Sequence, residues 1–120
     1  MKKGIIVIGS QGSGKTTKIK SLVSQVPKNQ MVWIYPTKSD AELKRLVKPE
    51  TTTIVIEGVV SINEMVRIQN YVREGICLSK NGKDTSAVFP KIIVSTCNLL
   101  ISDLANFEND FEIIKLKGKF

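Results

Sequence analysis

The sequence of 120 residues contains no long apolar run. No stretch approaches the ~20 apolar residues that a membrane-spanning helix requires. Near the amino terminus only residues 5–8 are continuously apolar, whereas a secretory signal needs roughly 7–15 such residues and a cleavage site of small residues. We therefore expect residues 5–8 to belong to a strand, and we expect a cytoplasmic protein with no membrane partner.

Cysteine is scarce too, with two residues in the whole chain. Cys77 and Cys97 do not have the spacing of a metal site, and both lie in apolar runs. Buried, reduced thiols are therefore expected, as is usual in a cytosolic protein. Linkers, repeats and low-complexity segments are absent from the sequence, so we expect a single domain over residues 1–120.

Acidic residues are fewer than basic ones. The chain has 11 acidic residues and 18 lysines and arginines, which give a formal net charge of +7. A basic balance favours polyanionic partners, nucleic acid above all. Scattered lysines also serve simply to keep a domain soluble, and a nucleotide-binding protein gains from a positive field as well. Charge alone therefore leaves a nucleic-acid partner open.

Short apolar runs alternate with helical patterns along the chain. The runs expected to form the strands of one sheet lie at residues 4–8, 31–35, 51–57, 91–96 and 111–116. Because these runs show little alternation of apolar and polar residues, they are typical of strands buried on both faces. We predict an α/β fold: a three-layer sandwich in which helices cover both faces of a five-stranded parallel sheet.

The helical segments lie between these strands. They are expected at residues 15–26, between Ser39 and Pro49, at residues 61–74 and, as a short helix or turn, at residues 97–106. Two of them begin with a capping box, in which a serine is followed three positions later by a glutamate. In the helix at 61–74 the apolar positions are Ile62, Met65, Val66 and Val72, and the opposite face carries Asn63, Arg67, Asn70 and Glu74.

One segment breaks this rhythm of strands and helices. Residues 76–89 hold two apolar stretches, at 76–78 and 87–89, with Asn81-Gly82 between them. Asn-Gly is a strong hairpin signal, because both residues tolerate the positive φ of a type I′ turn. We predict a β-hairpin inserted at about 76–89.

A phosphate-binding motif follows the first strand. Residues 9–16 match the pattern G-x-x-x-x-G-K-[ST]. The glycines allow backbone conformations in which successive N–H groups face a phosphate, and the loop leads into a helix amino terminus that favours an anion. The residues expected to bind the nucleotide are Gly9, Ser10, Gln11, Gly12, Ser13, Gly14, Lys15, Thr16 and Thr17.

Within this motif the side chains have separate expected roles. Lys15 is expected to reach the β- and γ-phosphates during catalysis, the Thr16 hydroxyl to bind Mg²⁺, and Thr17 to meet the α-phosphate. A P-loop site also needs a carboxylate at the tip of a nearby strand. Glu57 is the only acid that ends an apolar strand, so we expect it to be both a metal ligand and a catalytic carboxylate. A solvated glutamate at a strand end is the alternative.

Polar residues also end the strand at 91–96, where Ser95 and Thr96 lead into Asn98. Open α/β sheets bind their ligands at the carboxyl ends of the strands. Asn98 or Thr96 is therefore expected to orient the attacking water or to contact the γ-phosphate, with Asn98 as the catalytic candidate. Asn98 could equally cap the following helix, and the two roles are compatible.

Taken together, these motifs resemble the additional-strand class of P-loop NTPases and, within it, the AAA+ and superfamily 3 helicase group. Residues 9–16 match Walker A, residues 54–57 resemble Walker B, and residues 95–98 resemble sensor 1. The hairpin at 76–89 stands where a large branch of this group carries its pre-sensor hairpin. The resemblance implies the strand order 5-1-4-3-2. It also implies ATP and Mg²⁺ as ligands, with GTP not excluded.

The same resemblance assigns a partner to the hairpin. In helicases of this group the hairpin tip contacts DNA, which makes Lys80 and Lys83 candidate contacts to nucleic-acid phosphates. The alternative is that lysines suit any exposed turn.

The chain also departs from that group. Walker B usually offers Asp followed by Glu, whereas here Glu57 is followed by Gly58, and Glu64 is a weak substitute for the missing base. No arginine follows Arg73, so the expected C-terminal arginine finger is missing. Arg67 or Arg73 could act in trans across a homo-oligomer, or a partner protein could supply an arginine. We therefore expect hydrolysis to be slow or dependent on a partner.

Three functions are consistent with this sequence. The leading hypothesis is an ATP-binding P-loop NTPase, a slow or partner-stimulated ATPase linked to DNA handling. A small-molecule kinase is the first alternative, but its lid normally carries arginines and residues 76–89 contain none. A non-catalytic nucleotide-binding module is the second alternative, favoured by the single carboxylate at the site.

Overall fold

A computed structural model of the chain describes residues 4–10, 12–35, 40–80, 83–97 and 99–116. Five parallel strands form the main sheet: β1 (Gly4–Ile8), β2 (Met31–Ile34), β3 (Thr53–Ile56), β6 (Lys91–Thr96) and β7 (Phe111–Lys115). The helices are α1 (Lys15–Leu22), α2 (Asp40–Leu46) and α3 (Ile62–Glu74), with 3₁₀ helices at Lys28–Gln30 (η1) and Ile101–Phe107 (η2). The α/β class with a five-stranded parallel sheet is thus confirmed.

The strands of the main sheet lie in the order β2-β3-β6-β1-β7. This notation differs from the expected 5-1-4-3-2, because the element labels also number the two strands of the hairpin. When only the strands of the main sheet are counted along the chain, the order is 2-3-4-1-5, which is the expected series read from the other edge. β6 therefore separates β1 from β3 and pairs with both, since Ile92 lies opposite Gly4 and opposite Ile54.

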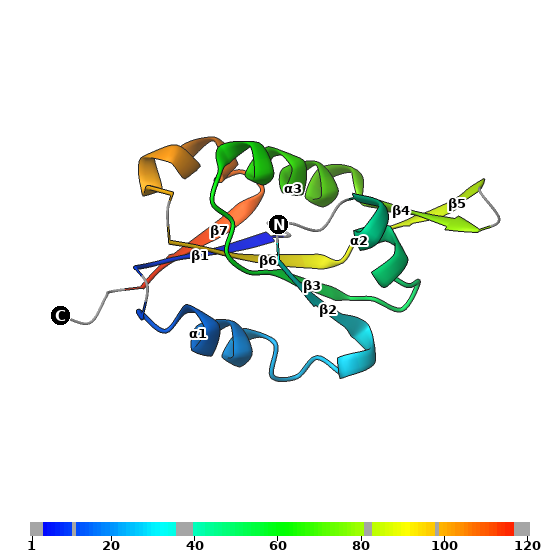
Figure 1. Ribbon diagram of the computed structural model, residues 1–120, viewed down its shortest axis with the longest axis horizontal. Coiled ribbons are helices and arrows are strands. Elements are labelled where there is room, and N and C mark those ends of the chain that lie inside the picture. Colours follow the sequence, from blue (N-terminus) through cyan, green and yellow to red (C-terminus); the bar gives the residue numbers. More distant parts are fainter. Residues whose placement is uncertain (1–3, 11, 36–39, 81–82, 98, 117–120) are drawn as a thin grey trace.

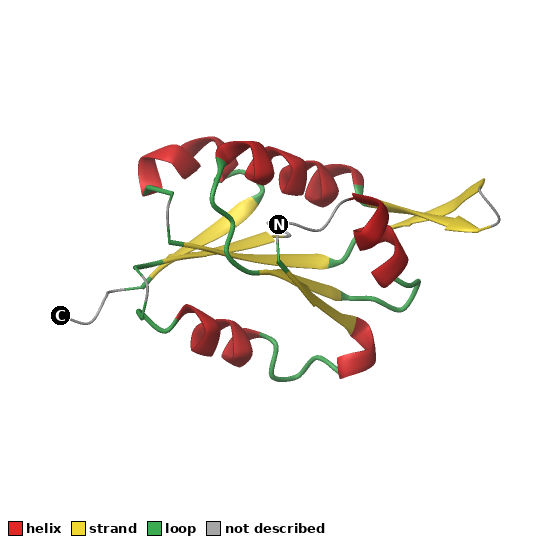
Figure 2. Cartoon of the chain, viewed as in Figure 1, coloured by secondary structure: helices red, strands yellow, loops and turns green. Residues whose placement is uncertain are grey.

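Helices cover both faces of this sheet (Figures 1 and 2). Side chains of a strand alternate between the two faces, so β1 contributes Ile5 and Val7 to one apolar core and Ile6 and Ile8 to the other. The core with Val7 packs against α1, whose Ile19 is completely buried. The core with Ile6 packs against α3 and η2, which lie with α2 on the opposite side of the sheet.

β4 (Ile76–Lys80) and β5 (Lys83–Val88) pair with each other and not with the main sheet. The predicted hairpin is confirmed, while its Asn81-Gly82 turn lies outside the described residues. Ile76 and Leu78 are buried in the core beneath α3, so they anchor the base of the hairpin. From there the hairpin extends beyond the layers, at the sheet edge where β6 begins (Figure 1).

The first helix is shorter than predicted, because α1 ends at Leu22 and not at Val26. Val23 N still donates to Ile19 O, but the following bonds span three residues, as between Val26 N and Val23 O at 2.9 Å. Pro27 disfavours helical backbone only at the residue before it, Val26, so it does not by itself account for an end at Leu22. Val26 nevertheless packs against the core beside α1, although it lies beyond the end of the helix.

The buried stripe of α3 also differs from the prediction. Met65, Ile68 and Val72 are buried, which is the i, i+3, i+7 spacing of a helix face. Ile62 and Val66, which were grouped with Met65 and Val72 as the apolar positions of this helix, are 38% and 44% exposed. The prediction failed because the apolar residues of this helix exceed what one face against the sheet can bury, and Ile68 was overlooked.

The expectation of two buried thiols is wrong for Cys97, which is exposed, whereas Cys77 is half-buried. Cys97 follows the last residue of β6, where the chain leaves the sheet. No helix in the described part of the chain is long and apolar enough to cross a membrane.

Candidate phosphate-binding site

The glycine loop connects β1 to α1 at the carboxyl edge of the sheet. Gly12 and Gly14 have φ angles of 82° and 90°, which residues with a Cβ rarely adopt. Gly9 N donates to Thr96 O at 3.3 Å, and Ser13 N donates to Ser10 O at 3.1 Å. The first bond ties the start of the loop to β6, and the second closes a turn within the loop.

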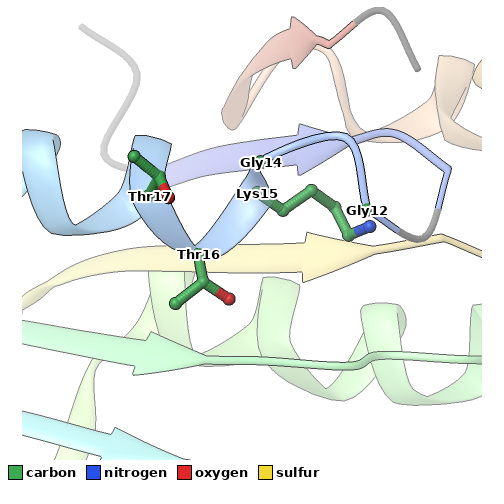
Figure 3. A pocket seen from close by; sticks show the side chains of 5 residues that line it. All are labelled: Gly12, Gly14, Lys15, Thr16 and Thr17. Atoms are coloured by element: carbon green, nitrogen blue, oxygen red, sulfur yellow. The ribbon is translucent and has the colours of Figure 1, made fainter. Parts of the chain in front are cut away.

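Lys15 is the first residue of α1, and its side chain folds back beneath the loop. Its Nζ donates to Gly9 O at 2.8 Å and to Ser10 O at 2.9 Å. Figure 3 shows the side chain running under the loop toward Gly12. These two bonds hold the ammonium group at the centre of the loop, where it can meet an anion that the backbone N–H groups also face.

A pocket of about 380 Å³ opens at this point, lined by Gly12, Gly14, Lys15, Thr16 and Thr17 (Figure 3). All five residues belong to the loop or to the first turn of α1. The unpaired N–H groups of a helix amino terminus and the positive end of the helix dipole favour a negative charge there. The pocket therefore suits a phosphate group.

Thr16 and Glu57 meet at the floor of this site. Glu57 directly follows β3, and it approaches Thr16 across the end of β6. The Thr16 hydroxyl donates to Glu57 Oε1 at 2.9 Å. A hydroxyl and a carboxylate oxygen this close form a donor set that fits Mg²⁺, which takes oxygen ligands and completes its shell with water and substrate phosphates.

Trp33 contributes a contact that the sequence did not reveal. Its indole Nε1 donates to Glu57 Oε2 at 3.0 Å, so the two carboxylate oxygens of Glu57 have different donors. The pairing of β2 with β3 places Trp33 opposite Val55, two positions before Glu57. That register could not be read from the sequence, which is why no motif pointed to Trp33.

The end of β6 holds the backbone that follows Glu57. Gly58 N donates to both the carbonyl oxygen and the hydroxyl of Ser95, each at 3.1 Å, and Val59 N donates to the same carbonyl at 3.0 Å. Thr96 is fully buried, and its hydroxyl accepts a bond from Leu99 N at 3.4 Å. Thr96, expected as a γ-phosphate contact, therefore stabilises the turn after β6. Its neighbour Asn98 lies outside the described residues.

The other candidate residues are spread over the molecule. Gln11 lies outside the described residues. Lys80 and Lys83 lie opposite each other in the register of the hairpin, and the hairpin leaves the sheet at the edge opposite the glycine loop (Figure 1). The backbone at these two positions therefore lies at the other end of the sheet from the phosphate loop (Figure 1).

Arg73, a candidate to act across an oligomer, has a partner within its own chain. Its Nε lies 2.9 Å from Asp110 Oδ2, although the Arg73 side chain is 53% exposed. Gln69 donates to the same oxygen at 2.9 Å. Asp110 thus joins the last turn of α3 to the segment that leads into β7.

The parallel sheet, the glycine loop before α1 and the carboxylate after β3 define a P-loop NTPase-like fold. No family model matches the chain. A stretch of 55 residues, or 46% of the chain, is 34% identical to magnesium-chelatase subunit ChlI, chloroplastic, from Oryza sativa subsp. indica, and the same values hold for the protein from subsp. japonica. This stretch spans 13% of those proteins.

Among solved structures, the A form apo structure of the NrS-1 C-terminal region superposes with a TM-score of 0.64 at 20% sequence identity. The match covers 95% of this chain and 29% of that chain. The similarity therefore extends over almost the whole fold described above, while the chain spans less than a third of the length of either relative.

Proposed function

We propose that this protein binds ATP with Mg²⁺ and hydrolyses it slowly, or only when a partner stimulates it. The observation that carries the proposal is the 2.9 Å hydrogen bond between the Thr16 hydroxyl and Glu57. It joins the phosphate loop to the one strand that ends in an acid, which is the arrangement a nucleotide-bound Mg²⁺ requires.

Different residues of the site bind the phosphates and the cation. The N–H groups of the loop and the ammonium group of Lys15 bind the β- and γ-phosphates. Thr16 and Glu57 hold the cation, which neutralises charge on the phosphates when it is bound. Gly9 and Ser10 keep Lys15 in place through their carbonyl oxygens.

Slow hydrolysis is expected because Glu57 has no second carboxylate beside it, and because Glu64 and Arg73 are engaged elsewhere. The next residue is Gly58, so no second carboxylate stands beside the first. Glu64 is occupied at the start of α3, where its Oε2 accepts a bond from Val60 N at 3.3 Å. Arg73 is paired with Asp110. A general base and an arginine each contribute orders of magnitude to such reactions, so a partner that supplies either one would accelerate turnover.

The topology and the charge support a link to DNA. β6 lies between the strand before the glycine loop and the strand before Glu57, which is the arrangement of the additional-strand class and its DNA-handling members. The projecting hairpin and the net charge of +7 suit a polyanion at a surface away from the nucleotide.

The test measures nucleotide binding and hydrolysis by the purified chain, with and without single-stranded DNA. We expect stabilisation against heat by ATP and Mg²⁺, of about 2.7 kcal/mol at a hundredfold excess over Kd, and a slow hydrolysis rate that DNA raises. Lys15→Ala should abolish the stabilisation. Lys20→Ala removes an exposed lysine of the same helix and should leave it unchanged. Equal behaviour of the two variants would contradict the proposal.

A non-catalytic nucleotide-binding module is the second candidate, and Gly58 is the observation that favours it. Binding of ATP with no release of phosphate, even with DNA present, would select this function over the first. Transfer of the γ-phosphate to a metabolite would instead select a small-molecule kinase.

A further inference from the structure

We propose that Trp33 is a positioning residue for the divalent-cation site. Its indole N–H binds one oxygen of Glu57 at 3.0 Å, which leaves the other oxygen to Thr16 and to the cation. This inference rests on the proposed function, because it concerns the cation that accompanies the nucleotide.

The sheet brings the three side chains to one face. Trp33 lies opposite Val55 in the pairing of β2 with β3. Glu57 is two residues beyond Val55, and side chains two apart in an extended segment point the same way. Val55 belongs to the core beneath α1, and Trp33 packs against the same core. Since Thr16 lies in the first turn of α1, all three reach the site from the α1 side.

The chemistry of the indole suits this role. An indole N–H is a donor without any acceptor atom, so Trp33 can hold the carboxylate but cannot compete for the cation. Its hydrogen bond to a carboxylate is charge-assisted, and the packing of the ring against the core fixes its direction. With one oxygen bound to Trp33 and the other facing Thr16, the carboxylate is held in one orientation before any cation arrives.

The first test replaces Trp33 by phenylalanine, which keeps an aromatic ring and removes the donor. Binding of a fluorescent, non-hydrolysable ATP analogue is measured as a function of Mg²⁺ concentration. Residues that orient a metal ligand typically contribute 10–100-fold to metal affinity, so Trp33→Phe should raise the half-saturating Mg²⁺ concentration about tenfold or more. Binding of the analogue in excess EDTA should not change.

Tyr35→Phe provides the matched control. It also removes a polar atom from an aromatic side chain near the end of β2, but Tyr35 is 61% exposed. This variant should show the wild-type dependence on Mg²⁺. If Trp33→Phe and Tyr35→Phe both follow the wild type, Trp33 does not position Glu57.

A double-mutant cycle shows whether Trp33 acts through Glu57. Glu57→Ala should weaken the dependence on Mg²⁺, and adding Trp33→Phe to it should cause no further change. An equal effect of Trp33→Phe with and without Glu57 would overturn the inference and assign Trp33 a purely structural role.

If the wild type binds no nucleotide at all, the proposed function fails. If it binds with Mg²⁺ while Trp33→Phe behaves normally, only this inference fails.

A second measurement does not depend on the folding of the Trp33 variant. Trp33 is the sole tryptophan of the chain, so the intrinsic fluorescence of the protein reports on its indole. Adding Mg²⁺ to the nucleotide-bound wild type should change this emission, because the cation alters the charge at the acceptor of the indole N–H. The change should vanish in Glu57→Ala, and its persistence there would contradict the inference.

Discussion

Around Gly9 the phosphate loop leaves no room for a side chain. A Cβ at this position would overlap Ser13 Oγ and would stand 3.2 Å from Leu116 Cβ. The hydroxyl of Ser13 is itself buried. The requirement for glycine at the start of the motif is therefore steric at this site.

Gly9→Ala should weaken nucleotide binding. Forcing an extra carbon into a packed site costs about 1–3 kcal/mol. If the free loop relieves this strain by leaving its phosphate-binding shape, the affinity for ATP falls by roughly 5- to 150-fold, to be measured by calorimetry. Ser13→Ala removes the oxygen that the new Cβ would meet, so Gly9→Ala combined with Ser13→Ala should recover part of the loss. No recovery in the double variant would show that the overlap with Ser13 is not the cause.

Individual residues also show where sequence interpretation succeeds and where it stops. Thr16 and Glu57 were expected to share a site, and they meet at 2.9 Å, because a motif and a strand end both pointed to the carboxyl edge of the sheet. Trp33 carries no motif, and its contact with Glu57 exists only because β2 and β3 pair in one particular register. Contacts that depend on strand register cannot be predicted from local pattern.

At the scale of elements, the amino terminus of α3 follows its sequence signal closely. The Ser61 side chain accepts a hydrogen bond from Glu64 N at 3.2 Å, as a capping box predicts. The glutamate of the box reaches Val60 N, one residue earlier than in the usual pattern. This cap directs α3 across the sheet immediately after the turn that carries Gly58.

Removing this cap should lower stability. Ser61→Ala leaves an amide at the helix start without its side-chain acceptor, and such changes typically cost about 1 kcal/mol. The loss should appear as a lower midpoint in urea denaturation with an unchanged slope. Ser24→Ala, in the exposed turn after α1, is the control and should stay within about 0.5 kcal/mol of the wild type. Equal losses in the two variants would argue against the cap.

Helix faces were harder to predict than helix positions. The segment at 61–74 was identified correctly, yet Ile62 and Val66, grouped with its apolar positions, are exposed. Six apolar residues of α3, Tyr71 included, compete for one face, and only packing against the sheet decides which of them are buried. The length of α1 was overestimated for a related reason, since Val26 packs on the core from a turn.

On the scale of the whole molecule, the charge and the hairpin can be tested together. If the hairpin binds DNA phosphates, replacing Lys80 and Lys83 by alanine should flatten the salt dependence of single-stranded DNA binding. Each lost contact lowers the slope of log K against log salt by about 0.7, so the double variant should lose about 1.4. The measurement is a titration by fluorescence anisotropy at several salt concentrations.

A control variant makes the same change in net charge elsewhere. Lys20→Ala with Lys28→Ala also lowers the net charge from +7 to +5, since two of the 18 basic residues are removed. These lysines lie in α1 and at the start of η1, outside the hairpin. If both double variants change the slope equally, DNA binding depends on the overall charge of the protein and the hairpin has no special role.

The topology was the most predictable property of the molecule. Five unalternating apolar runs separated by helical patterns permit few arrangements other than a parallel sheet with helices on both faces. The position of the hairpin followed from Asn81-Gly82 and the apolar stretches on either side of it, although its anchoring through Ile76 and Leu78 needed the packed structure. The layers of the fold were therefore readable from pattern, the strand order came from the family resemblance, and of the side-chain contacts at the site only that of Thr16 with Glu57 was expected.

The left-handed backbone at Gly58 limits the mutational routes open to this site. Its φ is 82°, and its N–H is held by Ser95 from the neighbouring strand. A glutamate or aspartate at position 58 would have to adopt a conformation that costs an L-residue about 1–2 kcal/mol. A lineage that gained the usual pair of acids here would have to bear this backbone strain, although a Cβ at position 58 would meet no other atom within 4 Å in the described structure.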